Sequence, residues 1–161
     1  NFMPVIGGVK VISESLNDTY NKLSNAIECC LKNEFKILPI SMMMQDKKTS
    51  IELGEVLATV FADRNVLFVA SSDFTHYEEQ SSACSKDSEL INAILALDVD
   101  RQYETLQRLN ISACGYGAMT AVITALRKMG ASHGNLLKYA TSGDTSGDYS
   151  SVVGYSSILI T

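Results

Sequence analysis

The feature that most limits the fold is a run of five apolar residues, Val66-Leu67-Phe68-Val69-Ala70, with no polar residue inside it. The run has the length of a strand, and a strand without polar alternation needs cover on both of its faces. Helices on both faces of a parallel sheet provide such cover. The run therefore predicts a buried strand over residues 66–70 in a helix-flanked sheet.

Helical and strand patterns alternate along the rest of the chain. Apolar residues at three- and four-residue spacing predict helices, and short apolar or β-branched runs predict strands. The expected helices cover residues 13–32, 51–60 (with Ser50 as N-cap), 86–97, 99–109 and 118–129, the last closed by Gly130. The expected strands cover residues 35–40, 66–70, 136–139 and 152–160, with a loop over 141–151. This order predicts an α/β layer structure, and a single domain over residues 1–161, because no linker or repeat interrupts it.

The composition excludes several classes of protein. Of 161 residues, 46% are hydrophobic and 19% are charged, which is typical of a packed soluble domain and argues against disorder. The net charge of −5 argues against a nucleic-acid partner, and no apolar run has the length of about 20 residues that a membrane helix needs. The four cysteines lack the spacing of a disulfide scaffold or zinc site, so we expect free thiols and a cytoplasmic protein.

The first candidate site follows the predicted strand 66–70. The segment Ser71-Ser72-Asp73-Phe74-Thr75-His76-Tyr77 would lie at the carboxyl end of that strand, where α/β sheets place their ligands. Asp73 and His76 are three residues apart, so one turn would aim both side chains the same way. A carboxylate beside an imidazole orients the ring, as a general base or a metal ligand requires. The alternative is an Asx-type turn with a solvated histidine.

The second candidate is Cys114, which lies just before the predicted helix 118–129. A thiol at a helix N-terminus is close to free backbone N–H groups, which favour the thiolate that attacks substrates or binds metals. Gly115 and Gly117 would allow another backbone or a ligand to approach closely. The alternative is a small buried cysteine that packs at the start of a helix.

Together these segments resemble the C-terminal part of the Memo family, whose prokaryotic members are called AmmeMemoRadiSam system protein B. The matching blocks are residues 8–11, 35–40, 71–77, Cys114-Gly115-Tyr116-Gly117-Ala118, and the closing block at 139–155. The resemblance implies the fold of the class III extradiol dioxygenases. In that three-layer α/β fold, a central mixed β-sheet carries helices on both faces.

The resemblance also implies a site for a redox metal, either iron or copper. Carried over by motif, His76 and Cys114 would be metal ligands, and Asp73 would act beside His76 in catalysis. Thiolate and imidazole suit copper(I), iron or zinc better than magnesium or calcium. Family members have further histidine ligands in segments resembling H-A-G-Y and G-P-x-H, which this sequence lacks. Where they have E-H-S-I-E, this sequence has Ser24-Asn25-Ala26-Ile27-Glu28.

The sequence leaves functions of different classes open. One is a metal-dependent oxidoreductase-like enzyme with an unidentified small-molecule substrate, or a metal-free version in which His76 activates Cys114 as a nucleophile. Another is a non-catalytic scaffold with a decayed metal site that binds a peptide or subunit, which the association of eukaryotic Memo-type proteins with signalling and motility permits. A third is an accessory role beside a radical-chemistry enzyme. Since the family's N-terminal segments are lacking, we expect a homo-oligomer or a partner segment, and no membrane partner.

Overall fold

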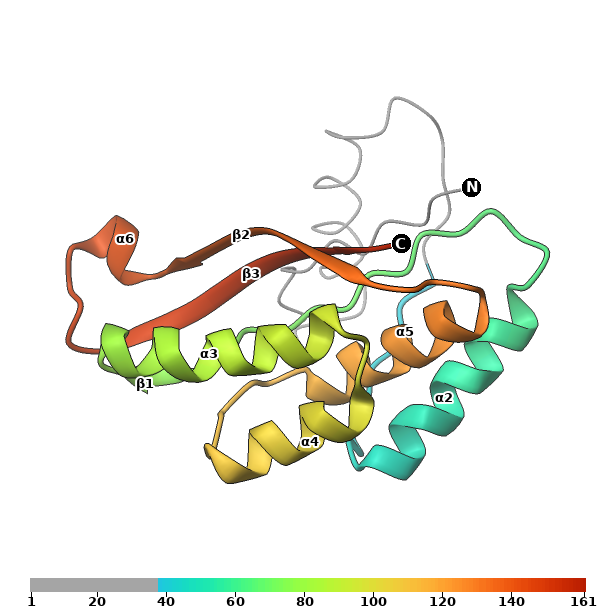
Figure 1. Cartoon of the computed structure of the whole chain (residues 1–161), viewed down its shortest axis with the longest axis horizontal. Coiled ribbons are helices and arrows are strands. Elements are labelled where there is room, and N and C mark those ends of the chain that lie inside the picture. Colours follow the sequence, from blue (N-terminus) through green and yellow to red (C-terminus); the bar gives the residue numbers. More distant parts are fainter. Residues whose placement is uncertain (1–37) are drawn as a thin grey trace.

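The computed structural model describes residues 38–161, so the expected helix 13–32 and most of the expected strand 35–40 lie outside the described residues. Within this range, five helices accompany a small antiparallel sheet with the strand order β1-β3-β2 (Figure 1). The helices are α2 (Lys47–Val60), α3 (Gln80–Leu95), α4 (Val99–Arg108), α5 (Tyr116–Lys128) and α6 (Gly143–Ser146). The strands are β1 (His76–Glu78), β2 (Gly134–Thr141) and β3 (Val152–Ile160). The predicted mixture of helices and strands is therefore confirmed.

Three described helices begin earlier than the sequence predicts, and α5 does so by only two residues. Helix α2 has Asp46 as its N-cap, and the Asp46 carboxylate accepts a hydrogen bond from the Thr49 backbone N–H at 3.0 Å. Ser50, the predicted cap, lies inside the helix, where its hydroxyl donates to the Asp46 carbonyl oxygen at 2.8 Å. Helix α3 begins at Gln80, six residues before the predicted start, because its first buried residue, Ala83, is too small to mark an apolar stripe.

Helix α5 ends as the sequence predicts. Gly130 follows it with φ +103°, a backbone conformation that side chains disfavour. The Gly130 N–H donates to the Arg127 carbonyl at 3.1 Å, and the Ala131 N–H donates to the Leu126 carbonyl at 2.9 Å. These two hydrogen bonds make a Schellman motif, so the expected C′ role of Gly130 is confirmed.

The predicted strand over residues 66–70 is wrong, and the burial it implied is found only in part, because Val66, Leu67 and Val69 are half-buried. Phe68 and Ala70 are buried, but residues 65–74 carry no strand, and no described strand forms a ladder beside them. The chain first bonds to the sheet at Phe74, whose N–H donates to the Gly154 carbonyl at 2.9 Å. A run of apolar residues indicates burial. It does not show that a neighbouring strand is present to form hydrogen bonds with it.

The sheet is dominated by a long antiparallel pair. Strands β2 and β3 pair from Gly134↔Ile160 to Thr141↔Gly154, so the predicted strand 136–139 is extended at both ends. The short strand β1 pairs with the start of β3 through His76↔Val153. The expected loop over 141–151 contains the single-turn helix α6.

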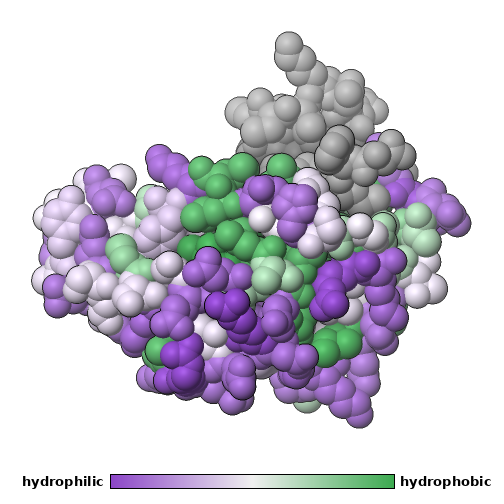
Figure 2. Space-filling model, in the orientation of Figure 1, coloured by the Kyte–Doolittle hydropathy of each residue, from purple (hydrophilic) through white to green (hydrophobic). Residues whose placement is uncertain are grey.

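The described helices α2 to α5 lie on one side of the β2–β3 pair in Figure 1. The core between them is built from apolar side chains of α3, α5 and β3, including Leu90, Ile94, Ile123, Leu126, Ile158 and Ile160. Leu136 and Leu137 of β2 are 41% and 63% exposed, and Figure 2 shows hydrophobic residues gathered near the middle of this face of the molecule. The described residues thus form two layers. None of their helices is long and apolar enough to cross a membrane.

Candidate metal centre

The structure brings together Asp73, His76 and Cys114, the three residues that the sequence singled out. Asp73 precedes β1, His76 is the first residue of β1, and Cys114 lies two residues before α5. One donor atom from each residue lies within 4.8 Å of those of the other two. This group joins two segments of the chain that lie 41 residues apart.

Asp73 and His76 lie close together just before and at the start of β1. Asp73 is buried and His76 is half-buried, and of the two residues between them Phe74 packs in the core and Thr75 is fully buried. The Asp73 Oδ2 atom lies 3.6 Å from the His76 Nε2 atom. The backbone of His76 is held by Ser112, whose hydroxyl accepts from the His76 N–H at 2.8 Å. The chain bends at Thr75 directly before β1, so the predicted proximity of Asp73 and His76 comes from a tight bend and not from a helical turn.

Cys114 is tied to Asp73 by two contacts. The Asp73 backbone N–H donates to the Cys114 Sγ atom at 3.2 Å, and the Cys114 N–H donates to the Asp73 carbonyl oxygen at 3.3 Å. An N–H directed at sulfur suits the thiolate, which is the form that binds metals. Cys114 is free and exposed, so the alternative of a buried packing cysteine is wrong.

Gly115 allows the two segments to come this close. A Cβ atom at this position would lie 2.2 Å from the Ser71 carbonyl oxygen and 2.8 Å from the Ser72 Cβ atom. The Gly115 N–H also donates to the Ser72 hydroxyl at 2.8 Å. The close approach that the sequence predicted for Gly115 is thus confirmed.

Gln45 holds the start of α5, and sequence reasoning missed it. Its Oε1 atom accepts from the Gly117 N–H at 2.9 Å, and its Nε2 group donates to the Cys114 carbonyl at 2.9 Å. One side chain therefore caps the helix and fixes the peptide that carries the thiol. Gln45 lies 69 residues before Cys114, so no local pattern could have connected them.

Two tyrosines flank the group, and both were missed. The pKa of Tyr155 is raised, first by burial and then by the negative charge of Asp73. Tyr155 is therefore a neutral phenol at neutral pH. Tyr77 follows His76 with a φ of +59°, which is uncommon for a residue with a side chain, and its ring centroid lies 5.8 Å from that of His76.

The three donors fit a transition metal. Bonds of about 2.1–2.2 Å at a tetrahedral angle place two ligand atoms about 3.5 Å apart, close to the 3.6 Å between Asp73 Oδ2 and His76 Nε2. The remaining pairs lie within 4.8 Å, so the donors would have to draw closer together to bind one ion. A set of thiolate, imidazole and carboxylate suits iron, copper or zinc. Three protein ligands leave a position open for another ligand.

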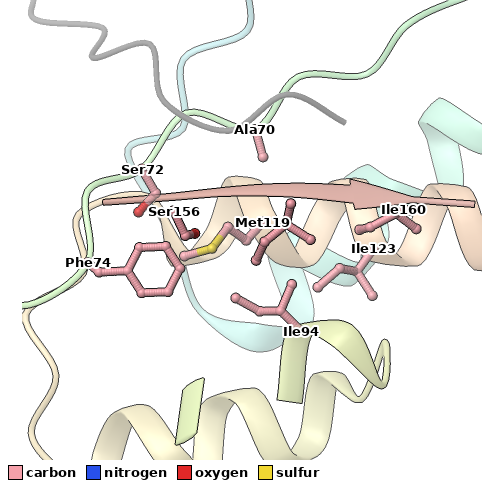
Figure 3. Close-up of a pocket in the computed structure, with 9 residues that line it drawn as sticks. Ala70, Ser72, Phe74, Ile94, Met119, Ile123, Ser156 and Ile160 are labelled. Atoms are coloured by element: carbon pink, nitrogen blue, oxygen red, sulfur yellow. The ribbon is translucent and has the colours of Figure 1, made fainter. Parts of the chain in front are cut away.

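An apolar pocket adjoins the group but does not contain it. It lies between β3, α3 and α5, and Figure 3 shows Phe74, Ser72, Ser156 and Met119 gathered at one end. Ser72 connects the pocket with the group, because its hydroxyl lies 4.0 Å from the Cys114 Sγ atom. The three donor residues are absent from the lining of this pocket.

Comparison with known proteins establishes the family. The sequence profile described as Memo-like protein matches residues 23–159. The chain belongs to this family. The resemblance seen in the sequence is thereby confirmed, and its most specific block, residues 71–77, supplies two of the three donors in the group.

Curated relatives come from several archaea. The chain is 49% identical to a MEMO1 family protein of Methanosarcina mazei, over 80% of this chain and 49% of the relative. It is 50% identical to one of Methanosarcina acetivorans, over 79% of this chain and 48% of the relative. It is 47% identical to one of Nitrosopumilus maritimus, over 82% of this chain and 48% of the relative. The chain therefore spans about half the length of these relatives.

Proposed function

We propose that this chain is a metal-dependent oxidoreductase-like member of the Memo family whose site binds iron or copper. The observation that carries the proposal is the convergence of a carboxylate, an imidazole and a thiol within 4.8 Å from two distant segments. Structural ion pairs would not require a cysteine, and the described residues offer no other such group of three. The substrate is a small molecule that reaches the group from the exposed side of Cys114.

In the proposed mechanism, each residue has a separate role. His76 and Cys114 would hold the metal, and a redox metal held there would supply electron exchange with the substrate. The Asp73 carboxyl group lies beside His76, orients the imidazole, and accepts a proton from the substrate. Tyr155 stays protonated and can donate a hydrogen bond toward the same space.

The proposal includes a larger assembly. The chain spans about half of its relatives, and two or three protein ligands make a weak site. We therefore propose that residues outside 38–161, a partner segment or a second copy complete the ligand set. The same completion would supply the three-layer fold with a central mixed sheet. The free thiols of Cys84 and Cys114 support a reducing, cytoplasmic setting.

The test is metal analysis of the purified full chain after anaerobic loading with Fe²⁺ or Cu⁺ and removal of unbound metal. Wild type should retain metal, and Cys114→Ala should lose most of it because the thiolate is the strongest donor. Cys84→Ala is the matched control, since Cys84 lies on α3 outside the group and its removal should leave the metal content unchanged. Equal metal content in Cys114→Ala and Cys84→Ala would refute the site.

A second candidate is a binding protein whose site holds no metal. It is favoured by the small donor set, because the described residues supply only one carboxylate, one imidazole and one thiol. In that case wild type would stay free of both metals after loading. Asp73→Ala and His76→Ala would then change the affinity for a peptide or small molecule without affecting any turnover.

A further inference from the structure

Asp87 is a buried carboxylate that lies outside the metal group. It is hydrogen-bonded to the segment that carries Asp73 and His76, two members of that group. Asp87 of α3 is fully buried, and its Oδ1 atom accepts two hydrogen bonds from Thr75. The Thr75 N–H donates at 3.0 Å and the Thr75 hydroxyl donates at 2.6 Å. The other oxygen, Oδ2, accepts from the Tyr139 hydroxyl at 2.7 Å. Burying a carboxylate is unfavourable unless it is fully hydrogen-bonded, so this arrangement calls for an explanation.

Thr75 lies between the two donors Asp73 and His76, and its backbone is fixed from a second direction by Gly154 of β3. The Gly154 N–H donates to the Thr75 carbonyl at 2.9 Å, next to the bond from Phe74 to Gly154. Gly154 also leaves room for the carboxylate, because a Cβ atom there would lie 2.0 Å from Asp87 Oδ2. Helix α3 and strand β3 thus hold the same residue from two sides.

We propose that Asp87 is a positioning residue for the metal group, acting through Thr75. By accepting from both the backbone and the side chain of Thr75, one oxygen fixes the backbone and the side-chain rotamer of that residue. This sets the turn that places Asp73 Oδ2 3.6 Å from His76 Nε2. The effect on metal affinity rests on the function proposed above, whereas the effect on the orientation of His76 does not.

A purely structural role predicts a different result. If Asp87 served only stability, changes at Thr75 would lower the stability of the fold without moving His76. A positioning role predicts that the imidazole of His76 moves when the hydroxyl of Thr75 is removed. The two roles are separated by measuring the imidazole and the stability in the same variants.

The first arm uses no metal. The full chain has two histidines, so imidazole NMR signals of His76 can be compared with those of His133, which lies beside the C-terminal Thr161. Thr75→Val and Asp87→Asn should shift the His76 signals and leave those of His133 unchanged. Thr75→Ser keeps the hydroxyl and should restore the wild-type spectrum.

The matched control is Thr120→Val, which makes the same substitution at another fully buried threonine. The Thr120 hydroxyl donates within α5, to the Tyr116 carbonyl at 2.9 Å. Thr120→Val should lower the urea midpoint less than Thr75→Val, because the Tyr116 carbonyl keeps its hydrogen bond from Gln102 whereas buried Asp87 loses a donor. Thr120→Val should leave the His76 signals in place. Equal His76 spectra in the two variants would overturn the positioning role.

The second arm measures binding of Co²⁺ to the full chain by visible absorption. Thr75→Val should weaken binding about tenfold or more relative to Thr120→Val, which is the usual effect of removing a group that supports a metal ligand. Thr75→Ser should bind nearly as well as wild type. Absence of Co²⁺ binding by wild type would refute the metal site, and the NMR arm would still decide the role of Asp87. Equal Co²⁺ affinities in Thr75→Val and Thr120→Val would refute positioning while the metal site stands.

Discussion

Gly115→Ala should separate the two halves of the candidate site. The φ of Gly115 is −118°, which any residue adopts, so the substitution acts through sterics alone. The new Cβ atom would lie 2.2 Å from the Ser71 carbonyl oxygen, and reaching an ordinary contact requires a shift of about 1 Å. Metal ligands tolerate errors of only about 0.2 Å in their distances. The alanine moves Cys114 away from the segment 73–76 and should therefore greatly weaken metal binding by the group.

The same change should destabilise the fold by a measurable amount. Overpacking at a rigid contact is unfavourable by about 1–3 kcal/mol, and loss of the hydrogen bond from Gly115 to Ser72 adds about 1 kcal/mol. With a urea dependence of about 2 kcal/mol/M, a loss of about 3 kcal/mol lowers the midpoint by about 1.5 M. Gly134→Ala is the control, since its nearest contacts would be 3.1–3.5 Å. Equal urea midpoints for the two variants, or wild-type Co²⁺ affinity in Gly115→Ala, would refute the reasoning.

Three further predictions follow from contacts around the site. Gln45→Ala should lower the free energy of unfolding by about 1–2 kcal/mol in urea, because it frees the Gly117 N–H and the Cys114 carbonyl; an unchanged midpoint would contradict this. Burial raises the pKa of Asp87, so the native state keeps the carboxyl proton to higher pH than the unfolded chain does. The free energy of unfolding therefore falls as the pH rises from the ordinary carboxyl pKa through the raised pKa of native Asp87. Asp87→Asn should remove this contribution to the pH dependence of stability. Identical slopes of urea midpoint against pH in wild type and Asp87→Asn would contradict the prediction. Gly130→Ala should lower stability by about 1 kcal/mol through its φ of +103°, a loss that calorimetry would detect.

The fold was predictable where local chemistry decides it. The helices over residues 51–60, 99–109 and 118–129 follow from their apolar spacing, and Gly130 closes the last of them through its positive φ. The strand over 66–70 failed because its apolar residues are buried or half-buried without a paired neighbour in the described part. A strand is defined by its hydrogen-bond partner, which a local run of residues does not encode.

The donors of the site were predictable, whereas their supports were not. Asp73 and His76 share a short segment, and Cys114 stands out at the start of a helix. Ser112 bonds to the backbone of His76 from 36 residues away, and Gln45 reaches Cys114 across 69 residues. Such contacts depend on tertiary packing, so only the folded chain reveals them.

The reciprocal contacts between Asp73 and Cys114 have a consequence for assigning energies to single residues. The amide of Asp73 donates to the sulfur, and the amide of Cys114 donates back to the carbonyl of Asp73. Deleting the thiol therefore leaves a main-chain donor without its acceptor, in addition to removing a ligand. The effect of Cys114→Ala taken alone will therefore overstate the share of the sulfur as a ligand. Replacing the Asp73 side chain leaves both main-chain contacts in place, so the two substitutions do not probe the same interaction.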